Sequence, residues 1–340
     1  MKKGLFMIVL MALSSLIYAC GTKEEVINDF VRDDVEITHK VTSGALTNEA
    51  QTGWTGGSRV QVTEAFKTNP AVVAIFAYDV LDILDTVGIA QTSIMDLGIP
   101  KSNVPTYLNA YDRDDVMNVG TLFIPDWDAL DLFMPDLIII GGRSAGAYDQ
   151  LKENYPDTDI LDVTTVQGEY IESMTRNAMN LAKIFPSVSD DINDKLNELT
   201  ADIALIKEEV KTYEALFVMV NGESLSFYGP TGRFAVLYDE FGFIPADANA
   251  EEGGSHGNVI GYEYVAAVNP QILFLLDRGA AIGGSSTIDQ VKENQLILGT
   301  DAGKNNDIFT LDPVAWYISP GGFQSTQQMI ADLQVVIDTM

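Results

Sequence analysis

Short apolar runs alternate with amphipathic segments along most of the chain. Runs such as residues 71–77 (AVVAIFA) and 136–140 (DLIII) are apolar throughout, which is typical of strands buried on both faces of a sheet. Residues 79–87 (DVLDILDTV) instead repeat apolar side chains at helical spacing, and Gly88 follows as a stop signal. This alternation predicts βαβ units and hence parallel sheets flanked by helices.

The same criteria predict the remaining elements. Asn221-Gly222 lies between two of the expected strands and predicts a hairpin. The expected strands are at residues 35–41, 59–63, 71–77, 136–140, 159–163, 215–220, 224–228, 272–276 and 308–311, and the expected helices are at 79–87, 126–133, 148–154, 170–184, 189–214, 234–241, 262–268, 287–294 and 323–340.

These elements fall into two sets, separated by a helical stretch at 170–184 that contains neither glycine nor proline. The fold class is therefore α/β, with two α/β lobes that have central sheets and are joined by a single long helix. We place the N-terminal lobe at 35–168, the connecting helix at 169–186 and the C-terminal lobe at 187–340.

The first 19 residues have the pattern of a sorting signal. Lys2 and Lys3 precede an apolar run of about 13 residues, which is short for a membrane span of roughly 20, and Cys20 follows as the only cysteine. The stretch resembles a bacterial lipoprotein signal, in which the cysteine is lipidated and anchors the protein to a membrane outside the cytoplasm. An ordinary secretory signal with an incidental cysteine is the alternative. Residues 20–34 are polar and predict a flexible tether.

The chain carries 49 acidic and 20 basic side chains, a formal net charge of −29. This excess argues against nucleic acid as a partner, because phosphate neutralisation requires a basic surface. Solubility or a high-salt habitat would account for the acidity equally well.

Three of the seven arginines lie in glycine-rich turns after apolar runs: Arg143 in IIIGGRSAG, Arg233 in YGPTGRF and Arg278 in LFLLDRGAAIGG. Loops at strand ends converge in open α/β sheets, and a guanidinium group presents a fork of donors to an anion. We call these residues the arginine triad, and they predict a preorganised site for an anionic ligand.

His256 and Tyr317 lie on two further loops of the second lobe. An imidazole and a phenol suit a hard ferric ion, and two protein ligands would complete a coordination sphere supplied mostly by a small chelator. A lone histidine is more often a surface or core residue, and Tyr317 beside Trp316 could equally be a core aromatic.

Seven blocks of the chain occur in this order: YDVLDILDTVGI, IPKSNVPTYLNAY, NVGTLFIPDWDAL, MPDLIIIGGR, YGPTGRFAVLYDEFGFIPAD, SHGNVIGYEYVAAVNPQILFLLDRGAAIGG and AWYISPGGF. Together they resemble the ferric-siderophore-binding lipoproteins of bacterial ABC importers, and within them the subgroup for catecholate and petrobactin-type siderophores. The resemblance covers about residues 60–340. It implies the rigid-hinge (class III) substrate-binding fold, a monomer without an intrinsic cofactor or catalysis, and Fe(III) bound only as the siderophore complex.

Site roles follow from the same resemblance. The arginine triad falls on basic residues around the catecholate oxygens, and Trp316 is a candidate for the wall of the site. His256 and Tyr317 fall on the pair that ligates iron when the siderophore is tetradentate. Asp128 and Glu263 fall on the two carboxylates that meet arginines of the permease. Two departures from the family pattern, Phe123 and the insertion-like stretch at 42–58, bear on ligand choice.

A secreted α/β-hydrolase is the alternative from another class. Residues 142–146 form a G-x-S-x-G string after a buried strand, with Ser144 as nucleophile, Asp239 as acid and His256 as base. No HGGG-type oxyanion segment accompanies it, and a pattern with three fixed positions arises often in glycine-rich chains. A third class, a surface adhesin or structural lipoprotein, would not explain arginines at strand ends.

Overall fold

The computed structural model describes residues 31–92, 94–248 and 257–339. The predicted signal segment, Cys20 and His256 therefore lie outside the described residues. In these ranges no helix is both long enough and apolar enough to cross a membrane.

The N-terminal lobe contains a five-stranded parallel sheet in the order β5-β4-β3-β6-β7. Every residue of β6 is buried, as its uniformly apolar sequence predicts. The strands are β3 (Val72–Ile75), β4 (Asp96–Ile99), β5 (Met117–Asn118), β6 (Leu137–Ile140) and β7 (Asp159–Asp162), and the helices between them are α1 (Tyr78–Thr86), α2 (Trp127–Phe133) and α3 (Tyr148–Asn154).

The C-terminal lobe contains a six-stranded mixed sheet in the order β11-β9-β8-β12-β13, with β10 also paired to β8. β8 (Glu214–Asn221) and β9 (Ser224–Tyr228) form the predicted hairpin, and β8 pairs in parallel with β12. The other strands are β10 (Ile244–Pro245), β11 (Asn258–Ile260), β12 (Ile272–Asp277) and β13 (Ile308–Leu311), and the short helices are α6 (Val236–Asp239), α7 (Tyr262–Val268), α8 (Arg278–Ala281), α9 (Ile288–Lys292), α10 (Gln295–Leu298) and α11 (Asp301–Asn305).

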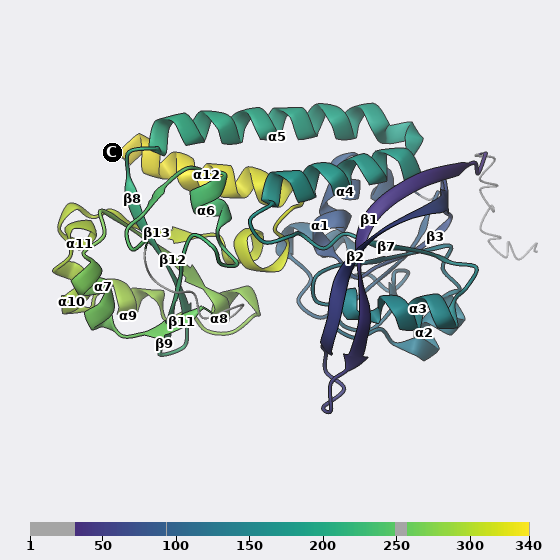
Figure 1. The fold of residues 1–340 in the computed structure, drawn as a ribbon, viewed down its shortest axis with the longest axis horizontal. Coiled ribbons are helices and arrows are strands. Elements are labelled where there is room, and N and C mark those ends of the chain that lie inside the picture. The colour runs from purple at the N-terminus through teal and green to yellow at the C-terminus, as the bar shows by residue number, and fades with distance from the viewer. Residues whose placement is uncertain (1–30, 93, 249–256, 340) are drawn as a thin grey trace, which may run out of the picture.

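Three longer helices cover one side of the molecule: α4 (Tyr170–Ile184), α5 (Ser189–Val210) and α12 (Phe323–Thr339). Figure 1 shows α5 running along both lobes, whereas α4, the connector that the sequence predicts, lies over the N-terminal lobe beside β1. The buried residues of α5 recur three or four positions apart from Ile192 to Val210, and Asp190 and Asp191 favour its N-terminus. The helix that spans the lobes is therefore α5.

A long antiparallel hairpin precedes the first lobe. It consists of β1 (Asp34–Thr47) and β2 (Trp54–Lys67), paired in register from Asp34–Lys67 to Thr47–Trp54. The sequence predicts strands only at 35–41 and 59–63, with an irregular insertion between them. The pairing extends through that insertion because its side chains bind to the lobe beneath, and the glycine-rich composition gives no sign of those contacts.

The two lobes are joined where α12 begins. The carboxylate of Asp82, on α1 of the N-terminal lobe, accepts hydrogen bonds from the backbone amides of Gln324 (2.7 Å) and Ser325 (2.9 Å), and from the Tyr107 hydroxyl (3.1 Å). Amides in the first turn of a helix lack partners within the helix, so Asp82 satisfies them from the other lobe. Burial raises the pKa of this fully buried carboxyl.

Candidate functional site

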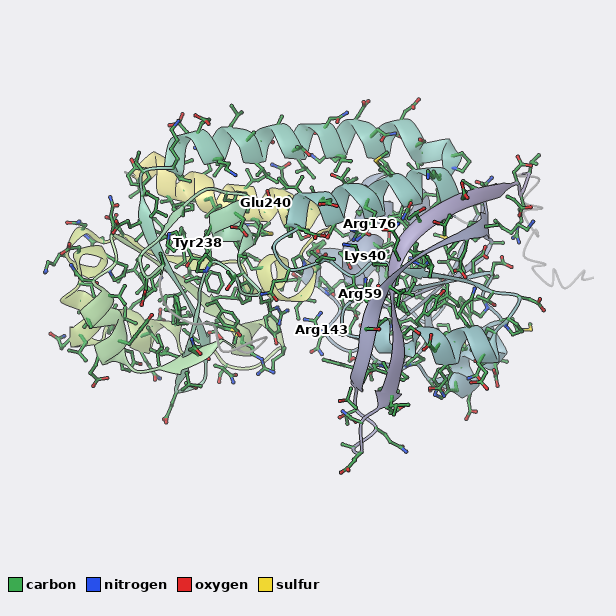
Figure 2. All side chains as sticks on the ribbon, in the orientation of Figure 1. Lys40, Arg59, Arg143, Arg176, Tyr238 and Glu240 are labelled. Carbon is green, nitrogen blue, oxygen red and sulfur yellow. The ribbon has the colours of Figure 1, made fainter. Side chains whose placement is uncertain are left out.

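Arg143 connects the two lobes at the carboxyl edge of the first sheet. It follows β6 closely, and its guanidinium donates hydrogen bonds to the backbone carbonyls of Tyr317 (2.8 Å) and Ile318 (3.2 Å). Those carbonyls belong to a π-helical turn, Val314–Ile318, of the C-terminal lobe. Figure 2 shows Arg143 at the junction of the lobes.

The other two members of the arginine triad meet the same tyrosine. Arg233 donates to the Tyr317 carbonyl (2.9 Å), and Nε of Arg278 donates to the Tyr317 hydroxyl (3.0 Å). The guanidinium carbons of Arg143, Arg233 and Arg278 lie 5.6, 4.1 and 5.8 Å from the centre of the Tyr317 ring. The structure thus brings together four of the predicted site residues, from both lobes, around one phenol.

The positive charges of the arginine triad lack ion-paired carboxylates among the described residues, although the nearby charge of Asp79 partly offsets that of Arg143. Arg32, Arg59 and Arg113 each form an ion pair with an aspartate, whereas no ion pair among the described residues involves the arginine triad. Burial, with the nearby charge of Arg233, lowers the pKa of Arg143 to about 10. Like charges held together in a partly dry site are unfavourable until an anion binds.

The phenol of Tyr317 is biased toward ionisation. Burial alone would raise its pKa, but the hydrogen bond from Arg278 and the charges of Arg233 and Arg278 together outweigh burial and lower the pKa. A phenol that loses its proton readily is a good ligand for a hard cation such as Fe(III).

Sequence reasoning missed two polar residues at this site. Asp79 lies in the first turn of α1, and burial, with some repulsion from Asp82, raises its pKa to about 7. The amide oxygen of Asn221 accepts a hydrogen bond from Arg278 (3.1 Å). The available signal for Asp79 is its position just after a buried strand, whereas the pattern around Asn221 indicates only a turn residue.

Trp316 is not part of this arrangement, although it is the neighbour of Tyr317 in sequence. Its side chain is 1% exposed, packs against Phe217 and Phe241, and donates from Nε1 to Asp332 (2.9 Å). The expectation that Trp316 forms a wall of the ligand site is corrected: it belongs to the core of the C-terminal lobe.

The hydrolase interpretation is also corrected. Ser144 is fully buried, and its hydroxyl bonds within its own turn, accepting from the Gly141 amide (3.1 Å) and donating to the Gly141 carbonyl (3.3 Å). Its φ of −103° lacks the strained geometry of a nucleophile elbow. A hydroxyl held in this way is not available to a substrate.

The remaining predicted residues are separate from the arginine triad. Asp128 and Glu263 are exposed in the first turns of α2 and α7, one in each lobe. Across residues 31–92, 94–248 and 257–339, no group of three or more histidine, cysteine or carboxylate side chains could hold a metal ion. Any ferric ion at this site would need most of its ligands from a chelator.

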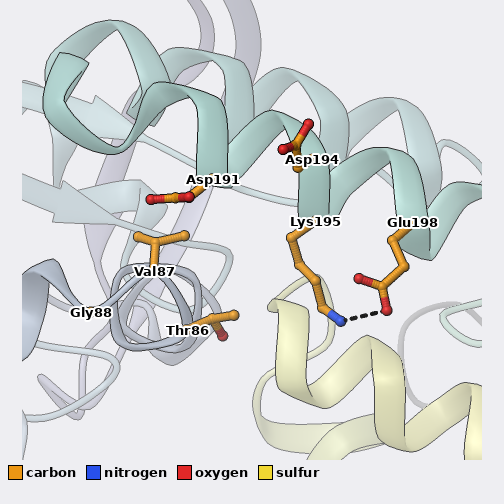
Figure 3. A pocket seen from close by; sticks show the side chains of 7 residues that line it. All are labelled: Thr86, Val87, Gly88, Asp191, Asp194, Lys195 and Glu198. Carbon is orange, nitrogen blue, oxygen red and sulfur yellow. Dashed lines mark hydrogen bonds and ion pairs between the residues drawn. The ribbon is translucent and has the colours of Figure 1, made fainter.

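A hollow of about 500 Å³ on another part of the molecule does not suit an anionic ligand (Figure 3). It lies between the end of α1 and the first turns of α5, and Asp191, Asp194 and Glu198 line it. Its one cation among the described residues, Lys195, is paired with Glu198 at 3.0 Å. The surplus of negative charge would repel an anionic chelate.

Comparisons with known proteins agree with this fold. A family model described as periplasmic binding protein matches residues 73–315. The chain is 32% identical to petrobactin-binding protein YclQ of Bacillus subtilis (strain 168) over 338 residues, 98% of either chain. The crystal structure of that protein aligns with a TM-score of 0.73 at 34% identity, over 81% of this chain and 95% of the other.

A second solved structure, the periplasmic catecholate-siderophore binding protein VctP from Vibrio cholerae, aligns equally well. Its TM-score is 0.73 at 29% identity, and the alignment covers 87% of this chain and all of VctP. The two-lobed arrangement described above is therefore shared with solved binding proteins.

Proposed function

Because the chain belongs to the periplasmic binding protein family, we propose that it captures a ferric siderophore outside the cytoplasm and delivers it to an ABC importer. Its relatives are named for petrobactin and for catecholate siderophores, which supports a catecholate-type ligand for this chain. The chain has no catalytic step of its own in this proposal.

The observation that carries the proposal is the arginine triad around Tyr317. Three guanidinium groups without carboxylate partners among the described residues supply positive charge inside a chain of net charge −29. A ferric catecholate complex is an anion that presents several oxygen acceptors, and forked guanidinium donors suit that geometry. Such an anion would relieve the repulsion among the three charges.

Iron contacts complete the proposed site. Tyr317 would act as a phenolate ligand, with His256 as a second ligand, when a tetradentate siderophore leaves two coordination positions open. His256 lies outside the described residues, so its role rests on its position in the sequence. A hexadentate siderophore would bind through the arginine triad alone.

Delivery and anchoring extend the proposal beyond the ligand. Asp128 and Glu263, exposed on separate lobes, would meet basic residues of the permease, and lipidated Cys20 would hold the monomer at the membrane surface.

A ligand titration of the chain from residue 21 onward tests the function. Tryptophan and tyrosine fluorescence should be quenched by a ferric bis-catecholate and not by a ferric hydroxamate or haem. Arg278→Ala should weaken binding about tenfold or more, because it removes a charged donor from the chelate. Arg113→Ala, which removes an exposed arginine paired with Asp115, should leave binding unchanged. Equal affinity of the wild type and Arg278→Ala would refute the arginine-triad model.

A further inference from the structure

The outer half of the β1–β2 hairpin lies across the edge of the N-terminal sheet where ligands bind in such folds. Near its middle, Arg59 pairs with Asp162 at the end of β7 (2.5 Å). Further out, the backbone amide of Gly44 donates to Asp149 on α3 (2.6 Å). Near the turn, Nε1 of Trp54 donates to the carbonyl of Phe123, beyond β5 (2.7 Å). Because β7 and β5 are the two outer strands, the hairpin crosses the whole sheet edge.

Close packing fixes the hairpin against the segment that follows Arg143. A side chain at Gly146, three residues after Arg143, would lie 2.4 Å from Cβ of Trp54, so the indole packs directly on this glycine. On the other side, the Tyr78 hydroxyl donates to the carbonyls of Pro100 (2.6 Å) and Ser102 (3.1 Å). Trp54 thus joins the hairpin to the segments after β5 and β6, and Tyr78 of α1 holds the segment after β4.

The turn of the hairpin encloses a hollow of about 670 Å³ together with the segments that follow β4 and β5. Its lining includes Thr52 from the turn, Ser102 and Asn103 after β4, and the apolar run from Leu122 to Pro125. Phe123 is 46% exposed and lines the hollow. Among the described residues, no basic side chain lines the hollow, and Asp126 is the only ionisable one.

We infer that this hollow is a second ligand subsite, built by the hairpin, which binds an uncharged alkyl or aryl arm of the siderophore complex. Charge complementarity assigns the two parts of the ligand: the anionic iron chelate binds the arginine triad, and a part without negative charge binds the hollow, where the described lining residues include no cation. The inference rests on the proposed function and identifies Phe123 and the hairpin turn as determinants of specificity.

Two synthetic ferric bis-catecholamides of equal charge test this assignment, one with an unsubstituted linker and one with a phenyl group on the linker. The wild type should bind the phenyl chelate about tenfold more tightly, because the ring buries apolar surface against Phe123. Phe123→Ala should remove that preference and leave affinity for the unsubstituted chelate unchanged. Leu132→Ala is the matched control, since Leu132 is exposed on α2 of the same lobe.

Equal affinity of the wild type for the two chelates would overturn the subsite while leaving the proposed function intact. An equal loss for both chelates in Phe123→Ala would also overturn it. Failure of both chelates to bind the wild type would refute the function and the subsite together. Trp54→Phe keeps an aromatic ring and removes the donor to Phe123, so it should weaken the phenyl preference without lowering affinity for the unsubstituted chelate.

Discussion

Replacing Arg143 by methionine should weaken ligand binding and at the same time stabilise the ligand-free protein. Methionine has a similar length and no charge, so it keeps most of the packing while removing the buried cation. Burial, with the charge of Arg233, lowers the pKa of Arg143 from the ordinary arginine range to about 10. At about 1.4 kcal/mol for each tenfold change in the equilibrium constant, the charged form costs roughly 3 kcal/mol at neutral pH.

Lost hydrogen bonds offset part of the stabilisation that comes from removing the charge of Arg143. The Tyr317 carbonyl keeps its bond from Arg233, so the Ile318 carbonyl is the one that loses its side-chain donor, at a cost of about 1–3 kcal/mol. The net change in unfolding free energy should therefore lie between about 0 and +2 kcal/mol, in the stabilising direction.

Thermal unfolding of the ligand-free protein at pH 7 measures this change, and titration with a ferric bis-catecholate measures binding. Arg143→Met should keep or raise the melting temperature and lower affinity at least about tenfold. Arg113→Met, which removes an exposed arginine, should alter stability by less than about 0.5 kcal/mol and leave binding unchanged. Destabilisation of Arg143→Met by more than about 1 kcal/mol would show that Arg143 is chiefly a structural tie between the lobes.

Three further outcomes are expected. Tyr317→Phe should remove the earliest tyrosinate absorbance change in an alkaline titration, because the arginines lower the pKa of this phenol; an unchanged titration would contradict that. Asp79→Asn should raise the melting temperature at pH 8 but not at pH 4. The ionised carboxyl of Asp79 is the unfavourable form, and in the folded protein this carboxyl takes up a proton as pH falls through about 7. Equal shifts in melting temperature at both pH values would exclude this cause. Charge reversal of Asp128 and Glu263 together should abolish cellular iron uptake while leaving affinity for the siderophore intact. Glu223→Lys, in an exposed turn, should leave uptake unchanged. A loss of affinity in the double variant would show that the docking residues are misassigned.

Local sequence patterns predict the parts of the structure that depend on neighbouring residues. Continuous apolar runs locate β6 and β12, and the rule that ligands bind at the carboxyl ends of strands predicts a common region for Arg143 and Arg278. Arg233 follows β9, which is antiparallel to β8, so the rule does not predict its place beside Tyr317. The same patterns miss the strand β4 because it is short and contains Gly98. A side chain there would lie 2.6 Å from Val119 and 2.8 Å from Phe133, so packing requires this glycine although glycine disfavours strands.

Long-range contacts determine side-chain placement and hairpin order, which local sequence patterns do not predict. Trp316 and Tyr317 are adjacent and similar in character, yet the π-helical turn places one in the core and the other among the arginines. The hairpin insertion looks irregular in sequence because its order depends on Asp149 and Phe123, about 100 and 70 residues further along the chain. Side-chain direction and distant partners are not encoded in residue spacing.

The bonds between the lobes indicate how affinity would arise. Arg143 already contacts the C-terminal lobe, and Asp82 already satisfies the first amides of α12. The Tyr170 hydroxyl accepts from the Gly321 amide at 2.9 Å. A ligand that meets lobes held in this way need not supply the free energy of a large closure, so more of its binding energy appears as affinity. The unfavourable step occurs during folding instead, when Arg143 is buried beside the charge of Arg233, and for that reason removing Arg143 should favour the empty protein and disfavour the complex.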